Sequence, residues 1–215
     1  MPAVRLILAS ASQRRRALLD TFKLPFAVGA ADVDETPRPG EPGHELAVRL
    51  ARAKALTVAG GTDGFVLAAD TVVWRRDHLY GKPEDADDAR AILRQLRGGT
   101  HLVTTAVALA RGSVIDERSV TSRVTLRAMR NDEIEAYVAS GDPLDKAGAY
   151  AIQNRDFKPV SRVTGCRCAV VGLPIGVVHA LLSSRGVVTP LSPRECCPYR
   201  YGENRCVPEA RPAPI

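Results

Sequence analysis

The stretch FVLAADTVVWRRDHLYGKP, residues 65–83, decides the fold and carries the most informative polar residues of the chain. Its first five residues form an apolar run with the length of a buried strand. Asp70 and Thr71 follow at the end of that run, residues 72–74 resume strand character, and a turn is expected at 76–78. The stretch therefore predicts a central strand that delivers a carboxylate and a hydroxyl.

Lys82 closes the same stretch, between Gly81 and Pro83. A carboxylate can hold a divalent metal or accept a proton from water, and a lysine can bind a phosphate. Asp70 and Lys82 therefore indicate a site for an anionic substrate. The alternative is that Asp70 only caps the end of a strand and Lys82 is solvated.

Length and composition are those of an ordinary globular protein: 215 residues, 45% hydrophobic and 25% charged. No apolar run approaches the ~20 residues that span a bilayer. The short apolar stretch at 4–9 lacks the long hydrophobic region of a signal peptide, so we expect a cytoplasmic protein without a membrane partner.

The net charge of +6 favours anionic partners of some kind. A nucleic-acid partner is disfavoured, because the chain has no block of five basic residues and only 5% aromatic residues. Residues 14–16, which are all arginine, keep nucleic-acid binding as a minor alternative.

Five cysteines lie in the last quarter of the chain, at Cys166, Cys168, Cys196, Cys197 and Cys206. Their odd number and their confinement argue against a disulfide framework for the fold. A structural metal on the last three is a minor alternative, because no C-x-x-C spacing occurs.

The N-terminal segment predicts an anion site. A strand over 4–9 leads, through a cap at Ser10 or Ser12, into a helix over 13–22. Free backbone N–H groups and short hydroxyls at such a junction bind phosphate. Arginines in the first turn oppose the helix dipole, and a bound phosphate would explain them; solvation on the helix face is the alternative.

The other segments alternate between helix and strand patterns. An acidic cluster at 32–35, which includes Glu35, offers carboxylates to a hard cation or to solvent. Lys54 lies on a predicted helix over 45–59. Further helices are expected at 84–96, 131–140 and 174–184, a hairpin at 101–110 and 119–126, a strand at 24–30, and short strands at 151–153, 159–163 and 168–171.

Residues 187–215 differ in composition, because six of the fifteen prolines fall there and apolar periodicity is weak. We expect one domain over 1–186 and a flexible tail over 187–215.

Several of these pieces together resemble one family, the Maf (septum-formation inhibitor) proteins. The matching motifs occur in the family's order and spacing over about residues 4–185. They are LASASQRR (8–15), ADTVV (69–73), GKP (81–83), DKAGAYAIQ (145–153) and VGLP (171–174).

The resemblance implies an α/β fold, with an elongated mixed sheet flanked by helices in two lobes around a central cleft, similar to the inosine triphosphatases. It implies a nucleoside triphosphate pyrophosphatase that releases a nucleoside monophosphate and pyrophosphate. The implied cofactor is a divalent cation, usually Mg2+ with Mn2+ as an alternative. The implied partner is the triphosphate substrate, and a homodimer is an option.

The resemblance also implies roles for individual residues. Asp70, Lys54 and Lys82 would be catalytic, with Asp70 accepting the proton of water, and Glu35 and Asp70 would hold the metal. Substrate phosphates would be bound by Ser10, Arg14, Arg15 and Lys146.

Arg14, Thr71 and Gln153 match the subgroup that acts on dTTP and UTP rather than the one that acts on 7-methyl-GTP. The amide of Gln153 suits a pyrimidine edge because it offers a donor and an acceptor. The alternatives are a 7-methyl-GTP pyrophosphatase and a nucleotide-binding regulator of cell division without turnover.

The chain departs from the family at several positions. Gln13 replaces a common proline, and Cys166 and Cys168 stand where the family usually has no cysteine. Asn154 replaces a common glycine, and we expect it to tolerate a left-handed backbone nearly as well.

Overall fold

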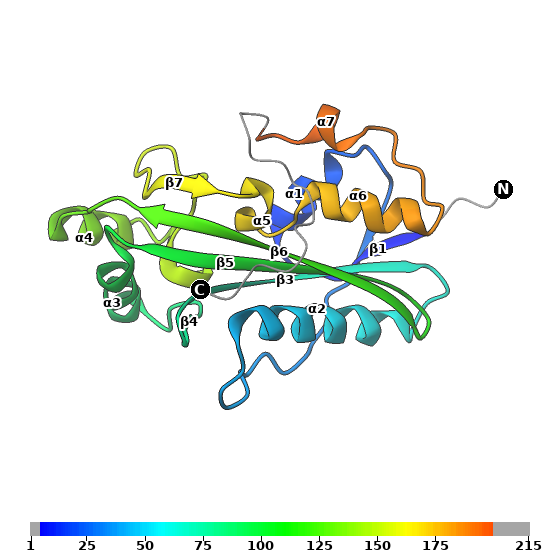
Figure 1. Ribbon diagram of the computed structural model, residues 1–215, viewed down its shortest axis with the longest axis horizontal. Helices are drawn as coiled ribbons and strands as arrows, with labels where there is room; N and C mark the ends of the chain where they lie inside the picture. Colours follow the sequence, from blue (N-terminus) through cyan, green and yellow to red (C-terminus); the bar gives the residue numbers. More distant parts are fainter. Residues whose placement is uncertain (1–4, 200–215) are drawn as a thin grey trace.

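A seven-stranded mixed sheet forms the middle of the protein in the computed structural model, which describes residues 5–199 (Figure 1). The strand order is β2-β1-β3-β5-β6-β7, and β4 pairs with β3 beside this path. The strands are β1 (Leu6–Leu8), β2 (Ala27–Val28), β3 (Phe65–Arg75), β4 (His78–Tyr80), β5 (Thr100–Arg111), β6 (Val114–Leu126) and β7 (Val160–Thr164). Only β1 pairs in parallel, with β2 and β3; the other pairings are antiparallel.

The strand β3 is longer than the sequence pattern indicated. It runs without a break from Phe65 to Arg75, so Asp70 and Thr71 lie in the middle of the strand rather than at the end of one. β5 stabilises this length, because its register with β3 extends from Val66 opposite Ala110 to Trp74 opposite Leu102. Two polar residues do not interrupt a strand whose neighbour pairs along its whole length.

Helices cover both faces of the sheet, as Figure 1 shows. The α-helix α2 packs along one face, whereas α1, α5 and α6 lie on the other. The helices α3 and α4 sit at the far end of the long strands. The helices are α1 (Gln13–Asp20), α2 (Gly43–Ala59), α3 (Ala86–Leu96), α4 (Asn131–Ala139), α5 (Arg167–Val171), α6 (Ile175–Ser184) and α7 (Pro193–Cys196), with a 3₁₀ turn η1 at Ala147–Ala149.

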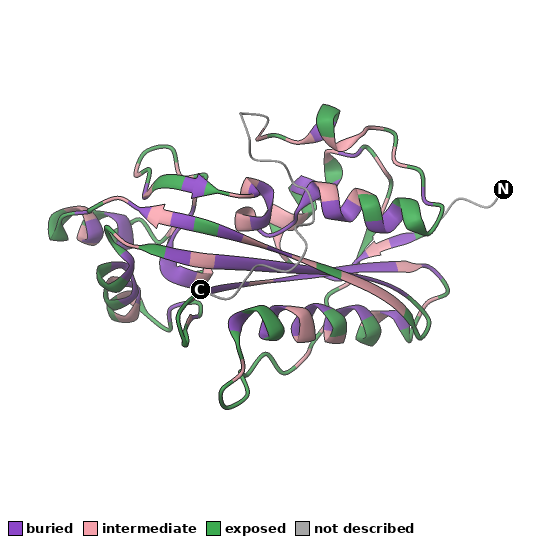
Figure 2. Ribbon diagram, in the orientation of Figure 1, coloured by how far each residue is buried: buried purple, intermediate pink, exposed green. Residues whose placement is uncertain are grey.

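The buried residues divide into two lobes, which the strands β3, β5 and β6 connect. In one lobe, apolar clusters form on both faces of the sheet, beneath α2 and beneath the layer of α1, α5 and α6. The other lobe has its own cluster, built from α3, α4, η1 and the ends of the long strands. Figure 2 shows β3 and β5 buried over most of their length, whereas β6 alternates with intermediate and exposed residues, and exposed residues also lie on the outer helix faces. The predicted elongated, two-lobed α/β fold is confirmed.

Two predicted strands are wrong. Residues 151–153 form a turn, and residues 168–171 belong to the helix α5. The apolar run at 168–171 is too short for its periodicity to separate a strand from a buried helix turn. The helix begins because Cys166 caps it, its Sγ accepting a hydrogen bond from the backbone N–H of Ala169 at 3.3 Å.

The segment after residue 186 begins as a packed stretch. Val187 is buried, α7 follows, and Cys196 belongs to the same core cluster as α6. The expected flexibility of 187–215 remains a prediction, and Cys206 with residues 200–215 lies outside the described part. The proposed three-cysteine metal site therefore falls partly outside it as well.

Candidate active site

A cleft of about 970 Å³ opens where one edge of β3 lacks a neighbouring strand. β1 ends at Leu8, opposite Leu67, and β4 begins its pairing opposite Val73. Within the described residues, 68–72 therefore have no strand partner on this side. The cleft lies between the two lobes, and both contribute to its walls.

Side chains alternate between the two faces of the sheet along β3, so the neighbouring residues Asp70 and Thr71 point to opposite faces. Val66, Ala68 and Val72 share a cluster with α2, and Asp70 points the same way, where it meets Lys54. Thr71 points to the other face, where it meets Arg15 of α1. One short stretch of strand therefore places a carboxylate and a hydroxyl in the same cleft with different partners.

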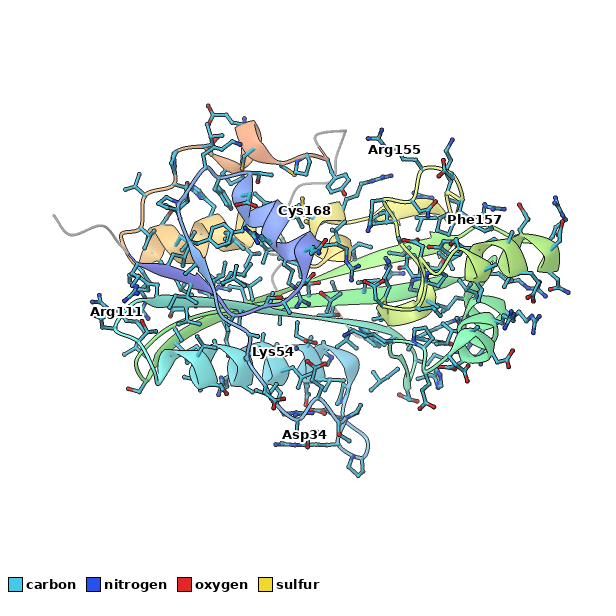
Figure 3. All side chains as sticks on the ribbon, turned by 180° about the vertical axis from the view of Figure 1, so that it is seen from behind. Asp34, Lys54, Arg111, Arg155, Phe157 and Cys168 are labelled. Atoms are coloured by element: carbon cyan, nitrogen blue, oxygen red, sulfur yellow. The ribbon has the colours of Figure 1, made fainter. Side chains whose placement is uncertain are left out.

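Lys54 joins the two predicted metal ligands. Its Nζ lies 2.6 Å from Oδ1 of Asp70 and 2.6 Å from Oε1 of Glu35. Lys54 and Asp70 are buried, whereas the side chain of Glu35 is 55% exposed. Partial burial raises the pKa of Glu35, but the hydrogen bond and charge of Lys54 and the charge of Lys82 lower it, and the net pKa lies below its usual value. Figure 3 shows Lys54 between α2 and the sheet.

The carboxylates of Glu35 and Asp70 fit a hard divalent cation. Both oxygens contact one ammonium nitrogen, so they lie no more than about 5 Å apart with a positive charge between them. Among residues 5–199, no group of three or more His, Cys, Asp or Glu could hold a metal. A cation here would take two carboxylates from the protein and its remaining ligands from water and phosphate, which is the usual pattern for Mg2+.

Arg15, on the other face of β3 from Lys54, is fixed by three hydrogen bonds. It donates to the carbonyl of Gly172 (3.0 Å), to Oγ of Ser10 (3.3 Å) and to Oγ1 of Thr71 (3.2 Å). Burial lowers the pKa of Arg15, and the charge of Asp70 partly opposes that shift. The guanidinium stays charged at neutral pH and is held ready for an anion.

Gly172 permits this arrangement. Its φ of +124° lies in the region that favours glycine, and a Cβ there would come within 3.3 Å of Nε of Arg15 and 3.4 Å of Oγ1 of Thr71. Thr105 supports Thr71 from β5, with the two hydroxyl oxygens 2.9 Å apart, and donates to the carbonyl of Ala169 at 2.6 Å. The VGLP motif therefore positions Arg15.

The second lobe contributes Lys82 and Lys146. The backbone N–H of Gly148 donates to the carbonyl of Gly81 at 3.0 Å, which ties the two lysine-bearing loops together. Asp145 forms ion pairs with Lys146 and, at 3.0 Å, with Arg14 of the first lobe. This carboxylate therefore links the two walls of the cleft.

Every predicted site residue lines this one cleft. They are Ser10, Arg14, Arg15, Glu35, Lys54, Asp70, Thr71, Lys82, Lys146 and Gln153. The roles assigned to them remain predictions.

Two residues of the cleft were missed in the sequence. Asp145 could have been found, because it directly precedes Lys146 in a charged loop. Tyr150 lies in the motif at 145–153 but was given no role, because its hydrogen bond to His101 of β5, with Oη and Nε2 2.8 Å apart, spans 49 positions and has no local signal. Asn154 was expected to tolerate a left-handed backbone, but its φ is not positive; its side chain donates to Asp142 and accepts from the backbone of Phe157.

No helix within residues 5–199 combines the length and the apolar character needed to cross a membrane.

Comparison with known proteins agrees with the motifs. A dTTP/UTP pyrophosphatase of Myxococcus xanthus is 50% identical over 186 residues, which cover 86% of this chain and 94% of the relative. A dTTP/UTP pyrophosphatase of Thermomicrobium roseum is 50% identical over 190 residues, covering 86% and 87%. The solved Ham1 protein of Staphylococcus aureus aligns with a TM-score of 0.47 at 15% identity, over 84% of this chain and 99% of that one. The family model described as Maf-like protein matches residues 5–185, and this chain belongs to that family.

Proposed function

We propose that this protein hydrolyses dTTP and UTP to the nucleoside monophosphate and pyrophosphate. The relatives described above, at 50% identity over most of the chain, carry the name of that activity. The observation that carries the proposal is the cluster of Asp70, Lys54 and Glu35 in a cleft whose opposite walls present arginines and lysines.

The cationic residues suit a triphosphate. Arg15 is fixed by three hydrogen bonds and would bind phosphate oxygens without losing much side-chain freedom. Lys82 and Lys146 on the other wall would bind the remaining phosphates and stabilise the charge that moves onto the leaving pyrophosphate. Ser10 adds a hydroxyl at the junction of β1 and α1.

Asp70 is the best-placed proton acceptor in the cleft. The lysine of α2 holds its carboxylate in a fixed position, next to the uncovered edge of β3. In this role Asp70 would take the proton of the water that attacks the α–β phosphoanhydride. A divalent cation held by Asp70 and Glu35 would supply charge neutralisation on the phosphates and a lower pKa for bound water.

Base selection is assigned to Arg14, Thr71 and Gln153. Gln153 is exposed at the second-lobe end of the cleft, where its amide can meet both a carbonyl and an N–H of a pyrimidine. Thr71 contacts Arg15, so it would also affect phosphate binding. The Mg2+ identity, a cytoplasmic location and a homodimer belong to the same proposal.

The test is pyrophosphate release with Mg2+ from dTTP, UTP, CTP, GTP and 7-methyl-GTP, repeated after chelation and after Mg2+ or Mn2+ is restored. Preferred release from dTTP and UTP, lost on chelation and regained with metal, is expected. Preferred turnover of 7-methyl-GTP would retain the enzyme class and overturn the base assignment. Binding of dTTP without release from any nucleotide would favour a regulator without turnover.

A further inference from the structure

The cysteines outside the cleft come together around α5 and α7. Sγ of Cys168, in α5, lies 3.2 Å from Sγ of Cys197, which ends α7. The two residues are 29 positions apart in the sequence, so the fold and not the local chain brings them into contact. In Figure 3 Cys168 lies in the layer on the far side of the sheet from Lys54.

We propose that Cys168 and Cys197 are a redox modification site, which hydrogen peroxide converts into a disulfide that thiols can reduce again. The sulfur atoms already touch, so bond formation needs a movement of about 1 Å to reach the usual S–S distance. The inference does not depend on the proposed function, because neither cysteine lines the cleft.

The different exposure of the two cysteines fixes the order of the reaction. Cys168 is fully buried, whereas Cys197 is half-buried and therefore open to a small oxidant. The sulfur of Cys197, as thiolate, attacks one peroxide oxygen; the O–O bond breaks, and Cys197 becomes a sulfenic acid while the other oxygen leaves as water. The sulfur of Cys168 then attacks the sulfur of Cys197, and the second oxygen leaves as water. Two thiols and one peroxide thus give one disulfide and two waters.

The surroundings of the pair bear on its reactivity. The charges of Arg167, Cys168 and Cys197 all act on Tyr199, so a positive charge lies in the neighbourhood of the pair, where it favours a thiolate. Tyr199 packs beside the pair: burial chiefly raises its pKa, charge on Cys168 or Cys197 raises it further, and Arg167 lowers it. Cys196 is directed elsewhere, with its thiol hydrogen-bonded to Thr21 of the turn after α1.

The bond would fasten the C-terminal segment to an element that supports the cleft. α5 provides the carbonyl that accepts from Thr105, and the glycine after it provides the one that accepts from Arg15. Residues 187–199 would then be clamped onto α5 in the oxidised protein. A cross-link of this loop length raises the midpoint of thermal unfolding by about 5–10 °C.

The test uses the full chain at low concentration, treated with hydrogen peroxide, alkylated and digested with trypsin. Cleavage after the arginines separates Cys166 (peptide 163–167), Cys168 (168–185) and Cys206 (206–215), while Cys196 and Cys197 share peptide 195–200. We expect a link between 168–185 and 195–200 within one chain, removed by dithiothreitol. The link should persist in Cys196→Ser, the matched control, and disappear in Cys197→Ser.

Thermal unfolding provides an independent measurement. The oxidised wild type and Cys196→Ser should unfold about 5–10 °C above their reduced forms, whereas Cys197→Ser should show no difference. The proposal is overturned by a link to peptide 163–167 or 206–215, by a link between two chains, by no link at all, or by equal midpoints for the oxidised and reduced protein. Because Cys197 is only half-buried, its serine variant remains informative even if Cys168→Ser does not fold.

Discussion

Nζ of Lys54 and Oδ1 of Asp70 lie 2.6 Å apart with both side chains almost completely buried, although they come from a helix and a strand on different layers. A buried ion pair of this kind stabilises the fold little more than apolar residues of similar volume would. Removing only one of the two partners is costly, because it leaves the other charge buried without a partner. The exposed Glu35 completes the group from the loop before α2. The burial of the Lys54–Asp70 pair is therefore better explained by the proposed chemistry of the cleft than by a gain in the stability of the fold.

Asp70→Asn should abolish most of the turnover while the protein still folds. The substitution keeps the shape and an oxygen that accepts from Lys54, and Glu35 continues to balance the lysine charge. Loss of the proton acceptor should lower kcat for dTTP on the order of 10²–10⁴-fold. Pyrophosphate release and a thermal melt measure the two effects. Asp32→Asn, in an exposed carboxylate of the same acidic stretch, is the control; activity near that of wild type in the Asp70 variant would refute its role.

Gly172→Ala should weaken substrate binding through Arg15. The new Cβ would approach Nε of Arg15 within 3.3 Å, at a φ that alanine adopts only with strain. We expect the KM for dTTP to rise about tenfold, from a weakened charge-assisted hydrogen bond, with a loss of about 1–3 kcal/mol in the free energy of unfolding. Kinetics and urea unfolding would measure both.

Gly186→Ala is the matched control for that experiment. Its φ of +72° is also positive, but nothing lies within 4 Å of the added Cβ. It should lose stability and leave KM unchanged. An equal rise of KM in both variants would show that backbone strain, and not the position of Arg15, causes the effect.

The strand patterns and family motifs predicted most of the fold. Apolar runs at 65–69 and at 101–110 are long and bounded by turn residues, so β3 and β5 were found from the sequence. The run at 168–171 was misassigned because four apolar residues fit a strand or a helix turn equally well. The gap between β1 and β4, which creates the cleft, depends on pairing register and has no signal in the sequence.

The residues that line the cleft were named one by one from the sequence and their roles remain predictions, but the contacts between them were not predicted. The prediction that Arg15 binds phosphate came from its place at the start of a helix. Its hydrogen bonds to Gly172 and Thr71 span 157 and 56 positions of the sequence. The bridge formed by Asp145 is likewise a contact between distant segments. Such contacts arise from tertiary packing, which local periodicity does not encode.

Gln153→Glu should change base preference toward CTP. A carboxylate accepts hydrogen bonds but donates none, so it loses its bond to the O4 of thymine or uracil and can accept from the N4 amino group of cytosine. The ratio of kcat/KM for dTTP to that for CTP should fall about tenfold or more, equivalent to one hydrogen-bonded pair. Gln153→Ala, which loses both bonding options, should lower turnover without a new preference. An unchanged ratio in the glutamate variant would remove Gln153 from base selection.

His101 should make the protein less stable in mild acid. Burial, with a smaller effect of the charge of Arg75, lowers its pKa from an ordinary 6.5 to about 4. Its Nε2 faces the hydroxyl of Tyr150, and within the described residues its Nδ1 has no hydrogen-bond partner. The folded protein therefore does little to stabilise the protonated ring. The unfolded chain therefore binds a proton near pH 6.5, whereas the folded protein does so only near pH 4. The contribution of the neutral ring is complete above pH 6.5 and is lost as the pH falls from there towards 4, in total about 3 kcal/mol.

The experiment compares urea unfolding of the wild type and His101→Gln at several pH values between about 7 and 4.5. Glutamine can keep a hydrogen bond to the hydroxyl of Tyr150 but does not titrate, so its free energy of unfolding should fall less steeply over this range. Tyr150→Phe removes that hydrogen bond but leaves the ring buried, and because burial is the main cause of the shift, this variant should retain the steep decrease. Equal slopes for the wild type and His101→Gln would mean that His101 does not control stability in this range.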